Sequence, residues 1–361
     1  MNFPDPKAFL PQAKSAGLAV LSAILLILAF PDFEVWVLAW FGLIPLLWAV
    51  EREKDSFAKS FVTGWIFGIV FFFGTCWWLT YAPIKYAGFP AFVAYFLLFC
   101  VTVVAGLFPA LFTGLLSLLI KRFGNTAILA APFVWVFTEF LRYWITGNNW
   151  NALGYSQAWN GLFDILPGIG GVLLVSFAVA LINTGSVLPF LGKGRFNSRF
   201  VWMAELSVLI ALLFVAFTSY EYWFPRTAQT LFMTERPQVI AIQPNVPMSG
   251  LTVEKWSELR RKHVELADAA INQLDKQLLF GKYGLQAVGK RLDSKDRPPI
   301  TVIFPESPMN FMYDEDTEFQ EFVSAFASMN DVNVLFNSAE PDPANKKYFN
   351  SAVLVDTRGK E

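Results

Sequence analysis

The chain has 361 residues, of which 55% are hydrophobic and only 16% are charged, and its formal net charge is −1. Soluble domains carry roughly 25% charged residues, and here the deficit lies in residues 1–225, whereas residues 235–361 have ordinary globular composition. The composition therefore excludes a wholly soluble protein and indicates a membrane domain, residues 1–225, followed by a soluble domain, residues 226–361. A net charge so close to zero indicates neither an acidic nor a basic partner.

The histidine and cysteine content argues against a metal site. His263 is the single histidine, and neither a CxxC nor an HExxH spacing occurs, so we expect no metal. Cys76 and Cys100 both lie in apolar runs. This favours buried, small hydrophobic side chains over a disulfide or a nucleophile.

About seven apolar segments in the first domain are candidates for transmembrane helices. They cover residues 16–30, 35–50, 57–79, 89–120, 127–145, 162–191 and 200–217. If the N-terminus is cytoplasmic, ten Lys and Arg residues fall in the cytoplasmic loops, and only Lys85, or Lys85 and Arg142, fall in the opposite loops. This bias predicts that the soluble domain lies outside the cytoplasm.

Two features of the membrane domain are polar. Glu139 and Arg142 are three residues apart, so they share a helix face, and we expect a buried structural pair that neutralises itself. The segment 146–159 that follows has no Lys or Arg but many amides, hydroxyls and aromatic rings. It is either an interfacial aromatic belt or a polar shelf that holds a lipid headgroup or a substrate.

The soluble domain alternates strands and helices, which predicts an α/β fold with a buried sheet. Expected strands are 238–246, 300–304, 332–337 and 348–356, and expected helices are 253–279 and 317–329. On the long helix we expect Trp256, Leu259, Val264, Leu266 and Ala270 to form the apolar stripe.

Glu306 stands directly after a buried strand and between Pro305 and Pro308, two residues that end the strand. A carboxylate at such a strand end is either an ordinary solvated loop residue or helix N-cap partner, or a partly desolvated group. Partial desolvation would make it a better base near neutral pH.

Taken together, these motifs resemble those of the apolipoprotein N-acyltransferase family, membrane-tethered members of the nitrilase (carbon–nitrogen hydrolase) superfamily. The matching pieces, in family order, are Phe30-Pro31, Pro45 to Trp48, Trp77 to Leu79, Glu139 with Arg142, Leu153 to Gln157, Gly171 to Phe177, Asn183, Gln243 to Asn245, Phe304 to Ser307, and Tyr348 to Ala352.

The resemblance implies a nitrilase-like α-β-β-α sandwich after the membrane domain, in a multi-pass protein of the bacterial inner membrane with its catalytic domain on the outer side. It implies transfer of a fatty acyl chain from a membrane phospholipid to the α-amino group of diacylglyceryl-cysteine on an apolipoprotein, through a thioester, with no cofactor and no nucleic acid. Glu306 would be the general base. Trp256, Tyr155, Gln157 and Asn245 would contact substrate.

The family also uses a lysine, a nucleophilic cysteine and a final span, to which nothing in these 361 residues corresponds. We therefore expect a chain that is incomplete at its C-terminus, with an open sheet edge at residues 348–356, and inactive as it stands. Two alternatives remain open at this stage: a membrane-tethered amidase or nitrilase, and a non-catalytic membrane protein that binds lipid or lipoprotein.

Overall fold

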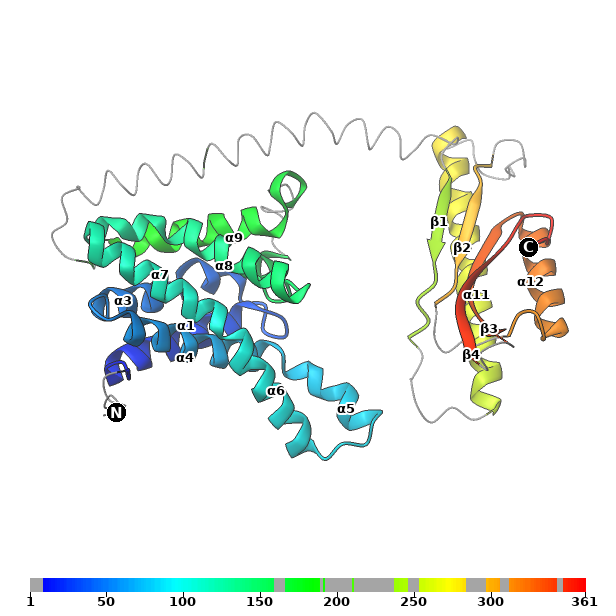
Figure 1. Cartoon of the computed structure of the whole chain (residues 1–361). Coiled ribbons are helices and arrows are strands. Elements are labelled where there is room, and N and C mark those ends of the chain that lie inside the picture. The colour runs from blue at the N-terminus through cyan, green and yellow to red at the C-terminus, as the bar shows by residue number, and fades with distance from the viewer. Residues whose placement is uncertain are drawn as a thin grey trace. The chain divides into compact units, whose positions relative to one another are not determined.

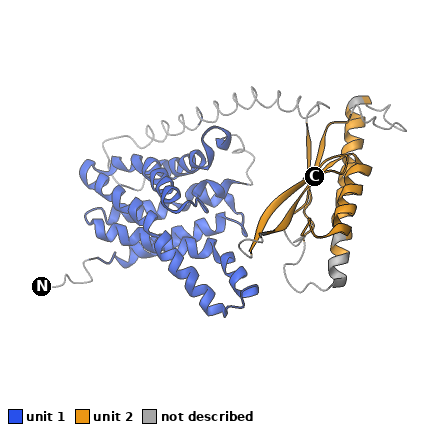
Figure 2. Ribbon diagram, turned by 45° about the vertical axis from the view of Figure 1, so that its right-hand side comes forward, with its two compact units in different colours: residues 1–221 blue, residues 222–361 orange. Residues whose placement is uncertain are grey.

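The computed structural model describes residues 9–158, 166–188, 191, 210, 237–245, 253–283, 297–305, 312–342 and 347–361. The chain divides into two compact units, residues 1–221 and 222–361 (Figure 2). We call the first the membrane unit and the second the α/β unit, and each is described by itself.

The membrane unit is a bundle of apolar helices (Figure 1). Its elements are α1 (Ala13–Ala29), η2 (Trp36–Leu38), α2 (Ala39–Gly42), α3 (Ile44–Arg52), α4 (Phe57–Thr75), η3 (Trp77–Thr80), α5 (Tyr81–Lys85), α6 (Ala91–Ala105), α7 (Leu107–Phe123), η4 (Asn125–Ala130), α8 (Ala131–Thr146), η5 (Leu153–Gln157) and α9 (Leu166–Val187). Among the described residues, four helical stretches are long and apolar enough to cross a membrane: Phe57–Thr75, Ala91–Phe123, Asn125–Thr146 and Leu166–Val187.

Small residues allow α4 and α7 to approach closely. A Cβ atom at Gly64 would collide with the hydroxyl of Thr113 and the carbonyl of Pro109, and one at Gly68 would lie 2.7 Å from the Cα of Gly106. Two glycines four residues apart are a common helix-contact pattern in membranes, where close backbone packing replaces the hydrophobic drive of water.

The predicted span 35–50 is wrong as a single helix. The structure divides it into η2, α2 and α3. Asn183 on α9, which is fully buried, holds the break: its Oδ1 accepts from the Leu43 amide at 2.9 Å and its Nδ2 donates to the Ala39 carbonyl at 2.8 Å. A buried side chain thus bonds backbone groups where the helix is interrupted. The predicted span 200–217 lies outside the described residues, apart from residue 210.

The α/β unit contains a small mixed sheet in the order β1-β2-β3-β4 (Figure 1). Its strands are β1 (Gln238–Ala241), β2 (Ile300–Ile303), β3 (Asn333–Asp342) and β4 (Lys347–Val355), with α11 (Val253–Tyr283) between β1 and β2 and α12 (Thr317–Asn330) between β2 and β3. The first three strands are parallel, and β4 pairs with β3 in the antiparallel sense. Both helices contribute to one apolar core with the sheet.

The buried face of α11 differs from the expected stripe. His263, Ala267 and Ile271, spaced four residues apart, are buried, whereas Leu266 is 37% exposed. Val264 packs against this core as expected, but Ala267 and Ile271 are buried in place of the expected Leu266 and Ala270, and the single histidine of the chain lies in the core. At its start α12 is capped by Asp316, whose carboxylate accepts from the Phe319 amide at 2.9 Å.

Candidate functional site

The segment 147–157, which follows α8, is held by buried ionisable side chains of that helix. Glu139 is 6% exposed, and its Oε1 accepts from the indole Nε1 of Trp135 at 2.8 Å and from the backbone amide of Leu153 at 2.6 Å. Arg142 donates from Nη1 to the carbonyl of Trp150 at 2.6 Å. Within the segment, these two side chains bond backbone groups, the amide of Leu153 and the carbonyl of Trp150. A change of side chain at either position would therefore keep the bond.

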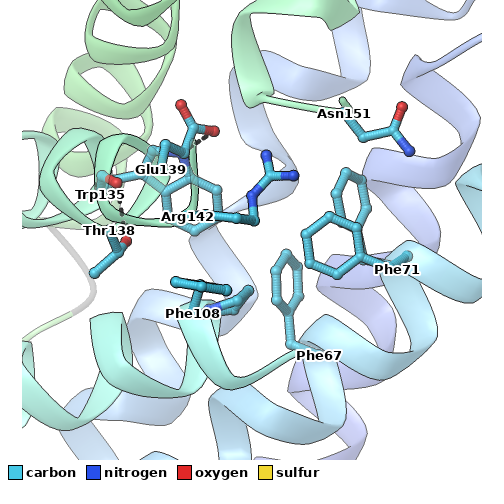
Figure 3. Close-up of a pocket in the computed structure, with 10 residues that line it drawn as sticks. Phe67, Phe71, Phe108, Trp135, Thr138, Glu139, Arg142 and Asn151 are labelled. Carbon is cyan, nitrogen blue, oxygen red and sulfur yellow. Dashed lines mark hydrogen bonds between the residues drawn. The ribbon is translucent and has the colours of Figure 1, made fainter. Parts of the chain in front are cut away.

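The expected Glu139–Arg142 pair is brought together on one face of α8, but not as an ion pair. Among the described residues, no contact within 4.0 Å joins the carboxylate to the guanidinium. The guanidinium instead lies over the ring of Phe72, 5.1 Å from its centroid, in addition to its bond to the segment. Figure 3 shows the two side chains leaving the same helix, with the Phe67 and Phe71 rings on a neighbouring helix.

Three further hydrogen bonds fix the segment to other helices. Asn151, in the left-handed backbone region with φ 56°, donates from Nδ2 to the hydroxyl of Thr75 and to the Sγ of Cys76, both at 2.9 Å. The Gly154 amide donates to the hydroxyl of Ser176 at 2.8 Å. A Cβ atom at Gly154 would collide with the carbonyl of Val172, so only glycine permits this approach of η5 to α9.

The two residues of this segment that were expected to contact substrate differ in exposure. Tyr155 is 44% exposed, whereas Gln157 is buried and donates from Nε2 to the carbonyl of Trp36 at 3.1 Å. The structure thus places Tyr155 where a ligand can reach it. It places Gln157 where it ties η5 to η2.

Two cavities adjoin this polar cluster. The smaller, of about 20 Å³, is lined by Glu139, Arg142 and Asn151 together with aromatic rings of α4, α7 and α8 (Figure 3). The larger, of about 580 Å³, has mostly apolar walls from α4, α6 and α7, and Arg142, Thr146 and Asn148 also line it. Its volume lies in the range of small-molecule sites, which are typically about 300–1,000 Å³.

Both cysteines line the larger cavity. Cys76 is buried as expected, but Cys100 is exposed, so the expectation of two buried cysteines is half wrong. Arg142, a charged group, lies in the wall of the same cavity, which no pattern in the sequence predicts.

In the α/β unit, two polar residues, Gln243 and Asn245, follow the carboxyl end of β1. The Ile242 amide bonds the Ile303 carbonyl and the Phe304 amide bonds the Leu335 carbonyl, both at 2.9 Å, so the ladder continues past β1 and β2. Asn245 then follows β1, is exposed, and accepts from Gln243 Nε2 at 3.2 Å. In α/β sheets, ligands usually bind at this carboxyl edge.

Two of the expected site residues have side chains outside those that the structure describes. Glu306 lies outside the described residues; Pro305, directly before it in the sequence, is the last described residue after β2. Trp256 lies on α11, but its side chain is not among those described. No group of three or more His, Cys, Asp or Glu residues that could hold a metal occurs in the described part of the chain.

Sequence reasoning used His263 only to argue against a metal. Its Nδ1 lies 2.6 Å from the Leu259 carbonyl, to which it donates, and its ring centroid is 6.1 Å from that of Phe304. Its Nε2 is buried and has no hydrogen-bond partner among the described residues. No motif marked this position, because a single histidine on an amphipathic helix is most often a core residue.

An apolar helical unit with a buried ionisable cluster, followed by a mixed α/β sheet, defines a membrane protein with an attached α/β unit. Comparison with known proteins is more specific. Residues 22–185 match the family model described as apolipoprotein N-acyltransferase N-terminal domain.

Curated relatives with the name apolipoprotein N-acyltransferase extend the match. The protein of Geobacter metallireducens is 27% identical over 348 residues, which are 95% of this chain and 61% of that protein. The protein of Rhizobium leguminosarum is 24% identical over 96% of this chain and 62% of its own length. That of Haemophilus influenzae is 33% identical over 45% of this chain and 30% of its own length.

These comparisons confirm the resemblance: the chain is similar to apolipoprotein N-acyltransferases over nearly its whole length. It spans about three-fifths of the length of the two relatives that it matches nearly throughout.

Proposed function

We propose that this chain belongs to an enzyme that transfers a fatty acyl chain from a membrane phospholipid to the N-terminal α-amino group of diacylglyceryl-cysteine on apolipoproteins. The observation that carries the proposal is the match to N-acyltransferases over 95% of the chain, through both units. A likeness confined to the apolar helices would be weaker, because apolar composition alone produces similarity.

The larger cavity of the membrane unit supports a phospholipid as the acyl donor. Its walls are apolar over most of their area, as a fatty acyl chain requires, and its polar lining includes Arg142, Thr146 and Asn148. A phospholipid has the matching distribution, with apolar chains joined to an anionic phosphate. An ionisable residue inside a membrane is by default a candidate for a functional role.

For the α/β unit we propose the nitrilase-like sandwich, with Glu306 as the general base. Thioester chemistry proceeds in two balanced steps. In the first step the base takes the thiol proton, the thiolate attacks the acyl ester carbonyl, and the lysophospholipid leaves as an alcohol that has received this proton. In the second step the substrate amine attacks the thioester, the thiolate leaves, and the amine proton passes to the base. The resemblance assigns the nucleophile to neither Cys76 nor Cys100, which lie in the membrane unit.

Location follows from the same proposal. We place the protein in the bacterial inner membrane with the α/β unit on the outer side, as the loop charges predict. Both proposed substrates, a phospholipid and a lipid-modified protein, would lie in the outer leaflet. Trp256, Tyr155, Gln157 and Asn245 remain proposed substrate contacts, among which exposure favours Tyr155 and Asn245.

The test is complementation. The protein that contains this chain is expressed in a strain depleted of its own N-acyltransferase, and the lipid on the N-terminal cysteine of a lipoprotein is identified by mass spectrometry. We expect a third, amide-linked acyl chain. Release of free amine from acyl amides without transfer would indicate the amidase alternative, and phospholipid binding without any product would indicate a lipid-binding protein; either result would overturn the proposal.

A further inference from the structure

The 147–157 segment is a wall of the larger cavity, because Asn148 and Trp150 line it. The same segment is bonded to α8 at two points that lie on either side of Asn151: Arg142 holds the carbonyl of Trp150, and Glu139 holds the amide of Leu153. Two side chains of one helix thus hold the wall, in addition to the bonds that Asn151, Gly154 and Gln157 make to other helices.

The two anchors are short hydrogen bonds, both 2.6 Å long. The anchor donated by the Arg142 guanidinium is also charge-assisted, and such bonds are roughly twice as strong as neutral ones. Glu139 and Arg142 are also buried, so water competes poorly for these bonds. A carboxylate and a guanidinium are costly to bury in an apolar helix bundle, and a hydrophobic pair would fill the same volume at lower cost.

We propose that Glu139 and Arg142 are positioning residues that hold the 147–157 segment as a fixed wall of the larger cavity, and thereby set the shape of the acyl-donor site. Because Arg142 lines both cavities, it would both hold the wall and contact a ligand in the larger cavity. The identity of the ligand rests on the proposed function; the anchoring of the wall does not.

The chain contains its own reporter for the state of the wall. Asn151, between the two anchored residues, covers the thiol of Cys76 through its bond to Sγ. Cys100 is the only other cysteine in the sequence, so Cys100→Ser leaves a single thiol. If the segment moves away, the cover over Cys76 moves with it, and the rate of thiol modification measures the opening.

The experiment uses the Cys100→Ser protein in lipid nanodiscs and measures the rate at which N-ethylmaleimide modifies Cys76. We expect Glu139→Leu and Arg142→Met to raise this rate about tenfold or more, which corresponds to about 1.4 kcal/mol. Glu139→Gln, whose Oε1 still accepts from the Leu153 amide, should stay within about threefold of the parent. Asn151→Gly removes the side chain that covers the thiol, so Cys76 should be modified fastest in this variant.

Glu53 provides a matched control. It is also a buried carboxylate, and it accepts from the Gln12 amide at 2.9 Å and the Ser15 hydroxyl at 2.7 Å. It precedes the start of α4, whereas Cys76 follows its end, about 28 Å away along 19 residues. Glu53→Leu should therefore leave Cys76 labelling unchanged.

Two results would overturn the inference. One is that Cys76 in both Glu139→Leu and Arg142→Met is modified at the rate of the parent protein, while Cys76 in Asn151→Gly is modified faster. The other is an equal rise in Glu53→Leu, which would indicate general loosening of the unit. Should the apolar variants fail to fold, Arg142→Lys gives the same test, because one ammonium replaces the planar guanidinium and only partial protection of Cys76 is expected.

Activity separates this inference from the proposed function. If the function is correct, Glu139→Leu raises KM for the phospholipid more than it lowers kcat, and Glu139→Gln restores KM. If the parent protein transfers no acyl chain while the labelling pattern appears as expected, the proposed function fails and the anchored wall stands.

Discussion

Asn183 offers a quantitative test of how the membrane unit is held together. Its side chain makes three buried hydrogen bonds: it accepts from the Leu43 amide and donates to the carbonyls of Ala39 and Val179, at 2.8 to 2.9 Å. Asn183→Leu keeps the volume roughly constant but removes all three. Two of them join α9 to the interrupted helix α2–α3, where no water replaces them.

The expected loss follows from the two bonds between helices. A buried polar group left without its partner costs about 1–3 kcal/mol, which for two groups is about 2–6 kcal/mol. Hydrogen bonds between membrane helices average about 0.6 kcal/mol and reach about 1.7, because the unfolded chain also finds partners. We therefore expect Asn183→Leu to lower the free energy of unfolding by about 2–4 kcal/mol.

The assay is SDS-driven unfolding in mixed micelles, followed by tryptophan fluorescence. Thr184→Val is the control, since Thr184 is equally buried and, among the residues that the structure describes, its hydroxyl donates to the Ala180 carbonyl of its own helix. It should cost less than about 1 kcal/mol. A change below about 0.5 kcal/mol for Asn183→Leu would refute the role of this side chain in holding the break.

Three further predictions concern single residues. Arg297→Met should lower the unfolding free energy of the α/β unit by about 2 kcal/mol or more, because the nearly buried guanidinium bonds both carboxylate oxygens of Asp275 at 2.9 and 3.2 Å; an unchanged urea midpoint would contradict this. Gly154→Ala should displace η5 from α9 and speed Cys76 labelling, whereas wild-type behaviour would show that the contact with α9 adapts. The pKa of Asp356 is lowered by hydrogen bonds from the backbone amide of Lys360 and from Arg358, so this carboxylate stabilises the fold above about pH 4, and the contribution is lost as the pH falls through its folded pKa. Asp356→Asn should therefore be less stable than wild type at pH 7 and equally stable at pH 2. A difference in stability that persists at pH 2 would be contrary evidence.

Long, strongly patterned segments were predictable. The helices that became α4, α8, α11 and α12, and the four strands of the α/β unit, all lie where the sequence places them, with ends shifted by a few residues. In apolar runs and alternating strands, the order of apolar and polar residues itself shows which residues are buried, so the local pattern is enough to predict the element.

The break between α2 and α3 was not predictable, because its cause lies 140 residues away in the sequence. An apolar run shows that a segment is buried but not that Asn183 bonds its backbone. The shifted face of α11 has a similar origin, since the core of the α/β unit takes His263 and leaves Leu266 exposed.

The candidate site was predictable only in part. The three-residue spacing of Glu139 and Arg142 shows that they share a face, but their partners are backbone groups of the following segment, which no residue pattern specifies. Asn151 was missed because a polar loop offers many amides, and only the left-handed backbone and its two acceptors single it out. Glu306 and the contacts of Trp256 stay predictions.

The central claim is that this chain provides the general base of a thioester-forming acyltransferase. Its most direct test is the rate of acyl-enzyme formation from a labelled phospholipid by the protein that contains this chain. Glu306→Gln is compared with wild type and with Glu315→Gln, a nearby exposed carboxylate as control. We expect the rate of acyl-enzyme formation to fall about 10²–10⁴-fold in Glu306→Gln and to stay unchanged in Glu315→Gln. Acyl-enzyme formation by Glu306→Gln at the wild-type rate would contradict the assignment of the general base.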